Sequence, residues 1–237
     1  MIGVAISTRN RRDTLLEALK HWTQHLPEGA ALVVVDDHSE QPFTSDGVTV
    51  IRHEARRGIA ATKNSGIAAL MDRGVEHLFL ADDDTWPITG DWWRPYVESD
   101  EKYFTYCWTH FAKDGAPVPK MKSVYRDSKL VAYQWSMGCL QYVHRDVINT
   151  VGGVNPAFGL AFEEHAEWAN RIHNAGFTSF IHQDHPDMKG RIYAGDEHYA
   201  VQRSFAMQSR SWKQRLIDKN TALRESLKDS TQFVEYR

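Results

Sequence analysis

The sequence contains two groups of acidic side chains whose spacing suits metal and proton chemistry. The first is Asp82-Asp83-Asp84, and the second is the pair Glu163-Glu164, which His165 follows directly. Adjacent aspartates repel one another unless a cation neutralises them, and carboxylate oxygens are ligands that Mg²⁺ and Mn²⁺ prefer. A carboxylate or a histidine can remove a proton near neutral pH. The acidic triplet therefore predicts a divalent-metal site.

The residues alone leave other interpretations of both groups open. In an extended segment, Asp82 and Asp84 would face one ligand while Asp83 faces the opposite side. The triplet could also be a solvated acidic turn or a helix N-cap before Pro87. For Glu163 and Glu164, the alternative is a favourable interaction with the positive end of a helix dipole.

Alternating strands and helices are predicted to position the acidic triplet. The sequence predicts strands at four apolar runs, residues 2–7, 31–35, 48–52 and 77–81. It predicts helices where apolar residues recur at helical spacing, over residues 13–25 and 58–71. This order predicts an α/β fold with a mostly parallel sheet covered on both faces. Ligands bind beyond the carboxyl ends of such strands, where Asp36-Asp37 and the triplet both lie.

The second half of the chain is rich in Trp and Tyr and predicts a smaller mixed region. A loop with Gly115, Pro117 and Pro119 resembles a hairpin turn. Strands are predicted over 131–137 and 178–182, and helices over 146–151, 163–175 and about 199–228. We expect most of the tryptophans to be core residues and some to contact substrate; the candidates are Trp92, Trp93, Trp108 and Trp135.

The absence of a clear linker predicts one main domain with two sub-regions. We expect a first half over 1–87, a second half over 88–198, and a C-terminal helical extension over 199–237. Arg203, Arg210, Lys213 and Arg215 are predicted to lie on a surface helix, since they form only a modest basic stripe.

The composition is that of a globular protein and limits the classes of partner. The chain has 237 residues, of which 42% are apolar, and a net charge of −3, so it lacks an overall basic balance for nucleic acid. Its two cysteines, Cys107 and Cys139, have no CxxC spacing, which favours a reducing compartment. No apolar stretch approaches the roughly 20 residues of a membrane span. We therefore predict a cytoplasmic protein without a membrane span.

Four ordered segments resemble the family 2 glycosyltransferases of the GT-A fold. They are residues 4–11, 33–39, 57–66 and 79–87, the last of which is similar to the family's metal-binding DxD strand end. Residues 151–158 and 164–171 resemble the family's acceptor-side loop and helix. The resemblance covers most of residues 1–182. It implies a GT-A type, Rossmann-like α/β sandwich with the smaller mixed region on the acceptor side.

The resemblance also implies roles for individual residues. It assigns metal binding to Asp82 and Asp84, and a late histidine of some relatives suggests His185 as a further ligand. The second strand's aspartate, at Asp36 or Asp37, would contact the nucleobase. The implied donor-binding residues are Ser7, Thr8, Arg9, Asp36, Asp37, Arg57, Lys63, Asn64, Asp82 and Asp83.

The resemblance leaves the catalytic base open. Where the family commonly has an aspartate, this sequence has His165, directly after Glu163 and Glu164. Any of the three side chains can act as a general base, so all three are candidates.

The activity implied by the resemblance is metal-dependent transfer of a sugar, with inversion. A hexose or N-acetylhexosamine would move from a nucleoside-diphosphate sugar, by preference a UDP-sugar, to an acceptor hydroxyl with Mn²⁺ or Mg²⁺. The acceptor could be a glycan, a protein, a small molecule or a modified nucleic-acid base. Two alternatives stay open: a metal-dependent nucleotidyltransferase, which would release pyrophosphate, and an inactive module that binds nucleotide sugars.

Overall fold

A six-stranded sheet forms the centre of the computed structural model, which describes residues 1–107, 110–111, 117–118, 122–195 and 209–237. Its strand order is β3 (Thr49–Arg52), β2 (Ala31–Asp36), β1 (Ile2–Thr8), β4 (His77–Asp82), β11 (Leu140–His144), β6 (Tyr103–Thr105). The first four strands are parallel, whereas β11 is antiparallel to both of its neighbours. The predicted α/β class, with a parallel first half and a mixed second half, is confirmed.

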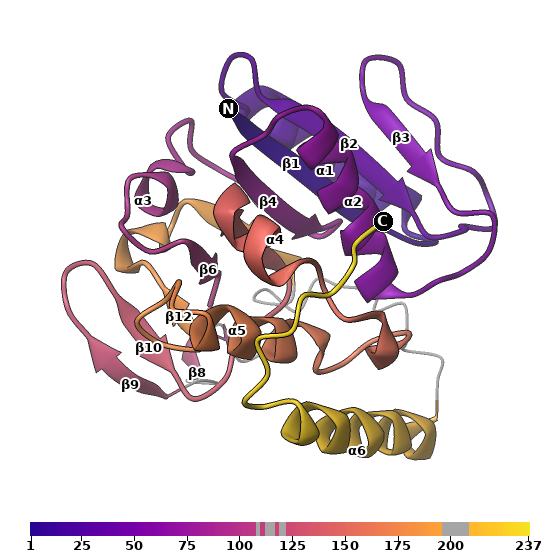
Figure 1. Cartoon of the computed structure of the whole chain (residues 1–237). Helices are drawn as coiled ribbons and strands as arrows, with labels where there is room; N and C mark the ends of the chain where they lie inside the picture. Colours follow the sequence, from indigo (N-terminus) through magenta and orange to yellow (C-terminus); the bar gives the residue numbers. More distant parts are fainter. Residues whose placement is uncertain (108–109, 112–116, 119–121, 196–208) are drawn as a thin grey trace.

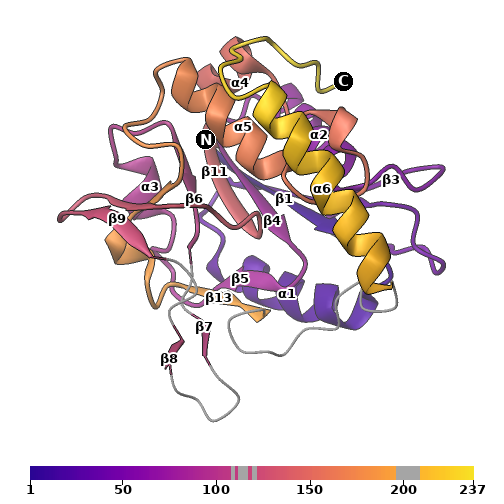
Figure 2. The ribbon, with the colours of Figure 1, turned by 90° about the horizontal axis from the view of Figure 1, so that it is seen from below.

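Helices cover both faces of the sheet, and each face has its own apolar core. Helix α1 (Arg12–His25) lies on one face, and α2 (Ile59–Asp72), α4 (Arg145–Val151) and α5 (Glu164–Asn174) lie on the other (Figures 1 and 2). Successive strand residues point to opposite faces, so Phe79 packs in the α1 core and Leu80 packs in the α2 core. This double burial explains why the parallel strands are continuous apolar runs.

Short elements surround the ends of the sheet. Strand β5 (Thr85–Pro87) pairs with β13 (Ile192–Ala194), and β7 (His110–Phe111) pairs with β8 (Pro117–Val118) as the predicted hairpin requires. The other small sheet has the order β12 (Gln183–Asp184), β10 (Val131–Tyr133), β9 (Ser123–Arg126). The remaining short elements are α3 (Arg94–Val97), η1 (Pro156–Phe158) and η2 (Pro186–Met188).

Two strand predictions in the second half are corrected by the structure. No strand forms over 178–182, because Glu101 and Gln183 side chains accept the backbone N–H groups of Ser179 and Phe180 in a bent segment. The strand in this region is β12, which begins at Gln183. The strand predicted over 131–137 ends at Tyr133, and the chain beyond it bends.

The C-terminal region contains helix α6 (Arg210–Ser226), which lies within the range 199–228 predicted as helix, of which residues 199–208 lie outside the described residues. Figure 2 shows α6 crossing α5 on the face of the sheet that α2 covers. The proposed boundary at 198/199 lies outside the described residues, as do Trp108, Gly115, Pro119 and Arg203. In the described part of the chain, no helix combines the length and apolar character needed to cross a bilayer.

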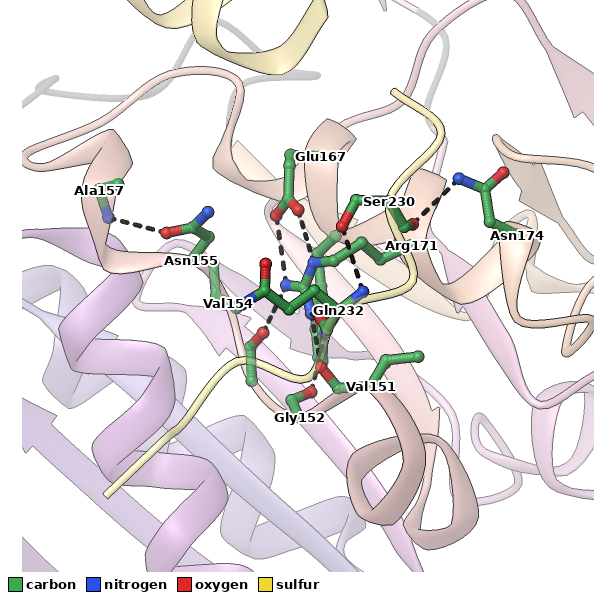
Figure 3. Close-up of polar contacts among 12 residues, drawn as sticks. Val151, Gly152, Val154, Asn155, Ala157, Glu167, Arg171, Asn174, Ser230 and Gln232 are labelled. Carbon is green, nitrogen blue, oxygen red and sulfur yellow. Dashed lines mark hydrogen bonds and ion pairs between the residues drawn. The ribbon is translucent and has the colours of Figure 1, made fainter. Parts of the chain in front are cut away.

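The chain after α6 returns to the segment before α5, where the carbonyl of Gln232 accepts from the Arg171 guanidinium over 3.5 Å (Figure 3). The buried Arg171 guanidinium pairs with Glu167 and donates to the carbonyls of Val151 and Gly153. A parallel bridge joins Gly152 to Val234 in the returning segment. The C-terminal tail is therefore part of the packed fold behind α5.

Candidate functional site

A cavity of about 690 Å³ lies beyond the carboxyl ends of β1 and β4, where ligands of open α/β sheets bind. The structure brings most of the predicted site residues to its wall. Those that line it are Ser7, Thr8, Arg9, Asp37, Lys63, Asp82, Asp83, Asp84, Glu163, Glu164 and His165. The acidic triplet and the start of α5, which are about 80 residues apart in the sequence, thus face one space.

Arg11 bridges two of the three aspartates. Its guanidinium lies 2.8 Å from an oxygen of Asp83 and 2.7 Å from an oxygen of Asp84, and the Thr8 hydroxyl donates to Asp83 over 2.7 Å. Strand β4 ends at Asp82 and the next two residues form a turn, so the expected alternation of the side chains is wrong. The Arg11 guanidinium therefore neutralises part of the negative charge of the triplet.

Asp82 has a buried oxygen that no protein group contacts. Its Oδ1 has no hydrogen-bond partner among the described residues, although the residue lines the cavity. Burial raises the pKa of Asp82 to about 7; Lys63 opposes the shift, while the charges of Asp84 and Glu164 add to it. An unpaired carboxylate facing other carboxylates is the environment in which a divalent cation stabilises the charged form. Asp82 and Asp84 therefore fit a hard divalent ion.

Lys63 is almost completely buried beneath the cavity and is 2% exposed. Its ammonium donates to the carbonyl of Gly138 and to Oε1 of Gln141 over 2.6 and 2.7 Å. Its charge also acts on Asp82 and Glu164. Lys63 thus holds the loop at Gly138 and reduces the repulsion between the two acidic groups.

The three candidate bases differ in their contacts. Glu164 is buried, and its Oε2 has no partner among the described groups. Its Oε1 lies 3.3 Å from Nδ1 of His165, whose Nε2 lies 3.2 Å from the carbonyl of Ser136. Glu163 instead forms an ion pair of 2.9 Å with Arg224 of α6. Of the three, Glu164 therefore has the buried acceptor oxygen without a protein partner.

The pKa of Glu164 is set by opposing effects. Burial raises this pKa, but the hydrogen bond and charge of His165 and the charge of Lys63 outweigh it, so the pKa lies below its ordinary value. Glu164 is consequently ionised near neutral pH and able to accept a proton.

The turn before α5 has an unusual backbone. Phe162 and Glu163 have φ angles of 73° and 69°, in the left-handed region that side chains seldom occupy. Such strain concentrates at functional sites, where surrounding contacts must maintain it. Here the turn aims Glu164 at the cavity.

Two aspartates at the end of β2 have structural contacts. Asp36 is fully buried, accepts from Ser39 and Arg52, and does not line the cavity. Asp37 lines the cavity, but its oxygens accept the backbone N–H groups of Arg57 and Gly58. Asp37 therefore shapes the loop that leads into α2, and the predicted donor contact of Asp36 has no support from its position.

Three other predicted site residues lie away from the cavity. Arg57 is exposed and lines a separate, smaller pocket. The buried Asn64 exchanges hydrogen bonds with the backbone of Val154, so it ties α2 to the loop after α4. His185 does not line the cavity; it accepts from the backbone of Asp187 and packs edge-on against Phe104.

Several residues of the cavity wall were not predicted as site residues. Arg56 and Arg9 both line the cavity. Burial lowers the pKa of Arg56, and the nearby positive charge of Arg9 lowers it further. Two like charges side by side form a positive patch suited to an anion. Gly58 is also part of the wall, and its position requires a glycine because a Cβ there would lie 2.4 Å from the carbonyl oxygen of Gly159.

Two further parts of the wall come from the loop after β10 and from α6. Trp135, one of the tryptophans named as candidate substrate contacts, lines the cavity together with the loop up to Cys139, where a longer strand was predicted. Helix α6 is mostly exposed, as expected for a surface helix, but its Lys213 and Ile217 also line the cavity. In the sequence, the four-residue spacing of Lys213 and Ile217 indicates that both side chains lie on the same face of a helix.

The chain is similar in sequence to glycosyltransferases. The model of the family "Glycosyl transferase family 2" matches residues 3–162. An uncharacterized glycosyltransferase of Haemophilus influenzae is 33% identical over 89 residues, which are 35% of this chain and 30% of that protein. The chain thus spans under a third of this curated relative.

Solved GT-A glycosyltransferases have a similar fold. GalNAc-T7, solved with UDP, GalNAc and Mn²⁺, has a TM-score of 0.58 at 14% identity over 75% of this chain and 41% of that one. A Drosophila β1,4-galactosyltransferase 7 mutant with manganese, UDP-Gal and xylobiose has a TM-score of 0.55 at 15% identity over 91% and 78%. The Pyrobaculum calidifontis mannosyltransferase PcManGT with GDP-Man and Mn²⁺ has a TM-score of 0.51 at 18% identity over 76% and 54%.

Proposed function

Because the chain belongs to glycosyl transferase family 2, we propose that its cavity transfers a sugar, with inversion, from a nucleoside-diphosphate sugar to an acceptor hydroxyl. The observation that carries this proposal is the convergence of Asp82 and Glu164 on one cavity, each with a buried oxygen that lacks a protein partner. The Asp82 carboxylate is suited to a metal ion that binds a diphosphate, and the Glu164 carboxylate is suited to remove a proton from an acceptor hydroxyl.

The donor diphosphate is proposed to lie between Asp82, Asp84 and the Arg9–Arg56 pair. Asp82 and Asp84 would hold a divalent cation, Mn²⁺ or Mg²⁺, which when bound neutralises charge on the departing diphosphate. The two guanidinium groups at the cavity wall attract the phosphates directly. Ser7 and Thr8, at the end of β1, border the same space.

A UDP-sugar carrying a hexose or N-acetylhexosamine is the proposed donor. Two of the three similar structures described above were solved with UDP or UDP-Gal, and the third with GDP-Man. These structures are similar to this chain in fold, so the identities of the nucleobase and of the sugar are proposals to be tested. The acceptor hydroxyl is also a proposal, and we do not assign the molecule that bears it.

Glu164 is the proposed base, and His165 is proposed to orient it. Both ring nitrogens of His165 face acceptors, Oε1 of Glu164 and the carbonyl of Ser136. These two contacts occupy both ring nitrogens of His165, so neither nitrogen is left to contact a substrate hydroxyl. Oε2 of Glu164 remains for the acceptor hydroxyl. Glu163 is proposed to fix the turn through Arg224.

The first experiment measures thermal stability with UDP, GDP, TDP and CDP, each with Mn²⁺, Mg²⁺ or EDTA. Ligand binding to the native state raises the melting temperature, so one diphosphate should stabilise the protein only with metal. Asp82→Asn should abolish that increase. If none of the four nucleotides stabilises the protein with any metal, the proposed donor site is wrong.

The second experiment measures release of the nucleoside diphosphate from the donor that the first experiment selects. Slow hydrolysis with the diphosphate as product supports sugar transfer, whereas release of pyrophosphate would indicate a nucleotidyltransferase. Glu164→Gln should reduce turnover about 10²–10⁴-fold, as expected for loss of a general base, with unchanged donor affinity. Glu163→Gln is the matched control and should retain most activity, because the Gln side chain keeps an oxygen that can accept a hydrogen bond from Arg224. Equal losses in both variants would contradict the assignment of Glu164.

A further inference from the structure

Three potential metal ligands lie together at the opposite end of β4 from the cavity. The ligand atoms of Glu76, His77 and His144 all lie within 4.8 Å of one another. His77 begins β4 and pairs in register with His144 at the end of β11. Asp82 ends β4, five residues further along, which corresponds to roughly 16 Å. The cluster is therefore separate from the proposed donor site.

The distances within the cluster suit a shared ion better than direct hydrogen bonds. Oε1 of Glu76 lies 3.5 Å from Nε2 of His144, and Oε2 lies 3.8 Å from Nε2 of His77. Charge-assisted hydrogen bonds are about 2.7–2.9 Å long. Ligands placed tetrahedrally at about 2.0–2.1 Å from Zn²⁺ are about 3.3 Å apart, so small movements would bring the three atoms around one ion.

The other nitrogen of each ring has a partner that can fix its orientation. Nδ1 of His77 lies 3.0 Å from the Tyr142 hydroxyl. Nδ1 of His144 accepts the backbone N–H of Asp146 over 3.1 Å, as the N-cap of α4, and lies 3.1 Å from Oδ2 of the same residue. A metal on Nε2 of His144 therefore requires a proton on Nδ1, which Oδ2 of Asp146 can accept in place of the cap. Metal-binding histidines commonly have such outer partners.

The main alternative is a set of ion pairs between Glu76 and protonated histidines. Glu76 lies 3.5 Å from Nε2 of His144 and 3.8 Å from Nε2 of His77, and both distances exceed the length of a charge-assisted hydrogen bond. The cluster therefore lacks the geometry of close ion pairs. Glu76 is 54% exposed, so an ion can reach the cluster from solvent.

We propose that Glu76, His77 and His144 bind one Zn²⁺ ion, with solvent at the fourth position. Two imidazole nitrogens and a carboxylate, from neighbouring ends of β4 and β11, are ligands that this ion accepts. The ion links the residue before β4 to the end of β11. Zinc therefore stabilises this edge of the fold independently of the donor site and of the proposed transfer reaction.

The test is calorimetric titration of the metal-free full chain with Zn²⁺, followed by Co²⁺ substitution and visible spectroscopy. We expect one Zn²⁺ ion per chain with micromolar or tighter affinity, and the intense visible absorption of tetrahedral Co²⁺. Glu76→Gln should weaken Zn²⁺ binding by about a hundredfold and remove the Co²⁺ signal, since losing even an outer partner typically costs 10–100-fold. The melting temperature with EDTA should stay unchanged, because Glu76 is exposed.

Two control variants distinguish Zn²⁺ binding at this cluster from binding elsewhere on the protein. His21→Gln removes a half-buried histidine that stacks on Trp86 and also lies near a glutamate, 3.1 Å from Glu17. His21 has no third ligand among the described residues, so the variant should bind Zn²⁺ as the wild type does. Asp84→Asn should lose metal-dependent UDP binding and keep the Co²⁺ signal. The proposal is overturned if Zn²⁺ does not bind at micromolar concentration. It is also overturned if Glu76→Gln retains the ion or Asp84→Asn loses it.

Discussion

The side-chain amide of Asn220 donates a hydrogen bond of 3.0 Å to the carbonyl of Phe162, two residues before the proposed base Glu164. The same amide group reaches the carbonyls of Phe158 and Ala161 over 2.9 and 2.8 Å. Asn220 is fully buried although it belongs to the mostly exposed helix α6. One side chain of α6 thus fixes the strained turn that aims Glu164.

We therefore expect Asn220→Leu to lower both stability and turnover. The buried carbonyls would lose their donor, at a cost of about 1–3 kcal/mol, which corresponds to a decrease of several degrees in melting temperature. Turnover should fall more than donor affinity, because the change affects the turn before Glu164. Thermal unfolding and steady-state kinetics measure the two effects.

Asn174→Leu is the matched control for this prediction. Its amide also donates to backbone carbonyls, those of Lys228 and Ser230, but at an exposed position where water can replace it (Figure 3). The control should lose little stability and no activity. If Asn220→Leu keeps wild-type turnover at a temperature where it is folded, α6 does not position the turn.

Arg11 gives a second prediction, in which two affinities change in opposite directions. Arg11→Gln removes the guanidinium that pairs with Asp83 and Asp84, so the triplet becomes more negative. At pH 8.5 we expect Mn²⁺ alone to bind more tightly, by about tenfold or 1.4 kcal/mol. UDP with Mn²⁺ should bind more weakly, because a positive charge near the phosphates is lost.

Calorimetric titrations of Mn²⁺ and UDP measure both changes. Arg12→Gln is the control, since Arg12 is exposed and lies over the ring of Phe43. It should leave both affinities unchanged. Weaker UDP binding without tighter Mn²⁺ binding would mean that the carboxylates paired with Arg11 do not contribute to the ion.

The acidic groups and most elements around the cavity were predictable from the sequence because their signals are local. Helical spacing predicted α2 and α5, and apolar runs predicted β1, β2 and β4. Parallel strands align their carboxyl ends at one edge, so topology alone placed the triplet near a ligand site. The family resemblance added the pairing of the triplet with the start of α5.

Contacts between distant segments decided what the sequence could not predict. Neighbours such as Arg56 and Arg57 have the same side chain, yet only Arg56 lines the cavity, because Asp37 fixes the turn between them and α2. Asn220 is a polar residue on a polar helix, so only the folded chain reveals that it is buried. The strand predicted over 178–182 failed because the Glu101 side chain accepts backbone donors there.

Asp184 provides a prediction about pH and stability. Burial raises its pKa to about 7, and hydrogen bonds from Tyr96 and from the backbone of Cys107 and His185 only partly oppose this. Between about pH 4 and pH 7 the folded state then holds a proton that the unfolded state has released. This carboxyl group therefore makes stability fall as pH rises through that window, with no further change above pH 7.

Urea unfolding of the wild type and Asp184→Asn at several pH values isolates this effect. The variant should be less stable at acid pH, since its amide faces two backbone N–H donors. The difference in unfolding free energy between wild type and variant should shrink as pH rises from 4 to 7. Other groups, such as His182 with a pKa lowered by burial to about 4, affect both proteins equally. A difference that stays constant with pH would contradict the raised pKa.

The return of the C-terminal tail gives the last prediction, at Gly152. This residue has a φ of 75°, and a Cβ there would lie 1.9 Å from the carbonyl oxygen of Val234. Gly152→Ala should therefore displace the tail in addition to the backbone cost of an alanine at positive φ, about 1–3 kcal/mol. Gly176→Ala is the matched control: its φ is 84°, but a Cβ there meets nothing within 4 Å, so only the backbone cost applies. Limited proteolysis with mass spectrometry should show early cleavage near residues 228–234 in Gly152→Ala alone. Equal cleavage in the two variants would mean that the contact between Gly152 and Val234 does not hold the tail.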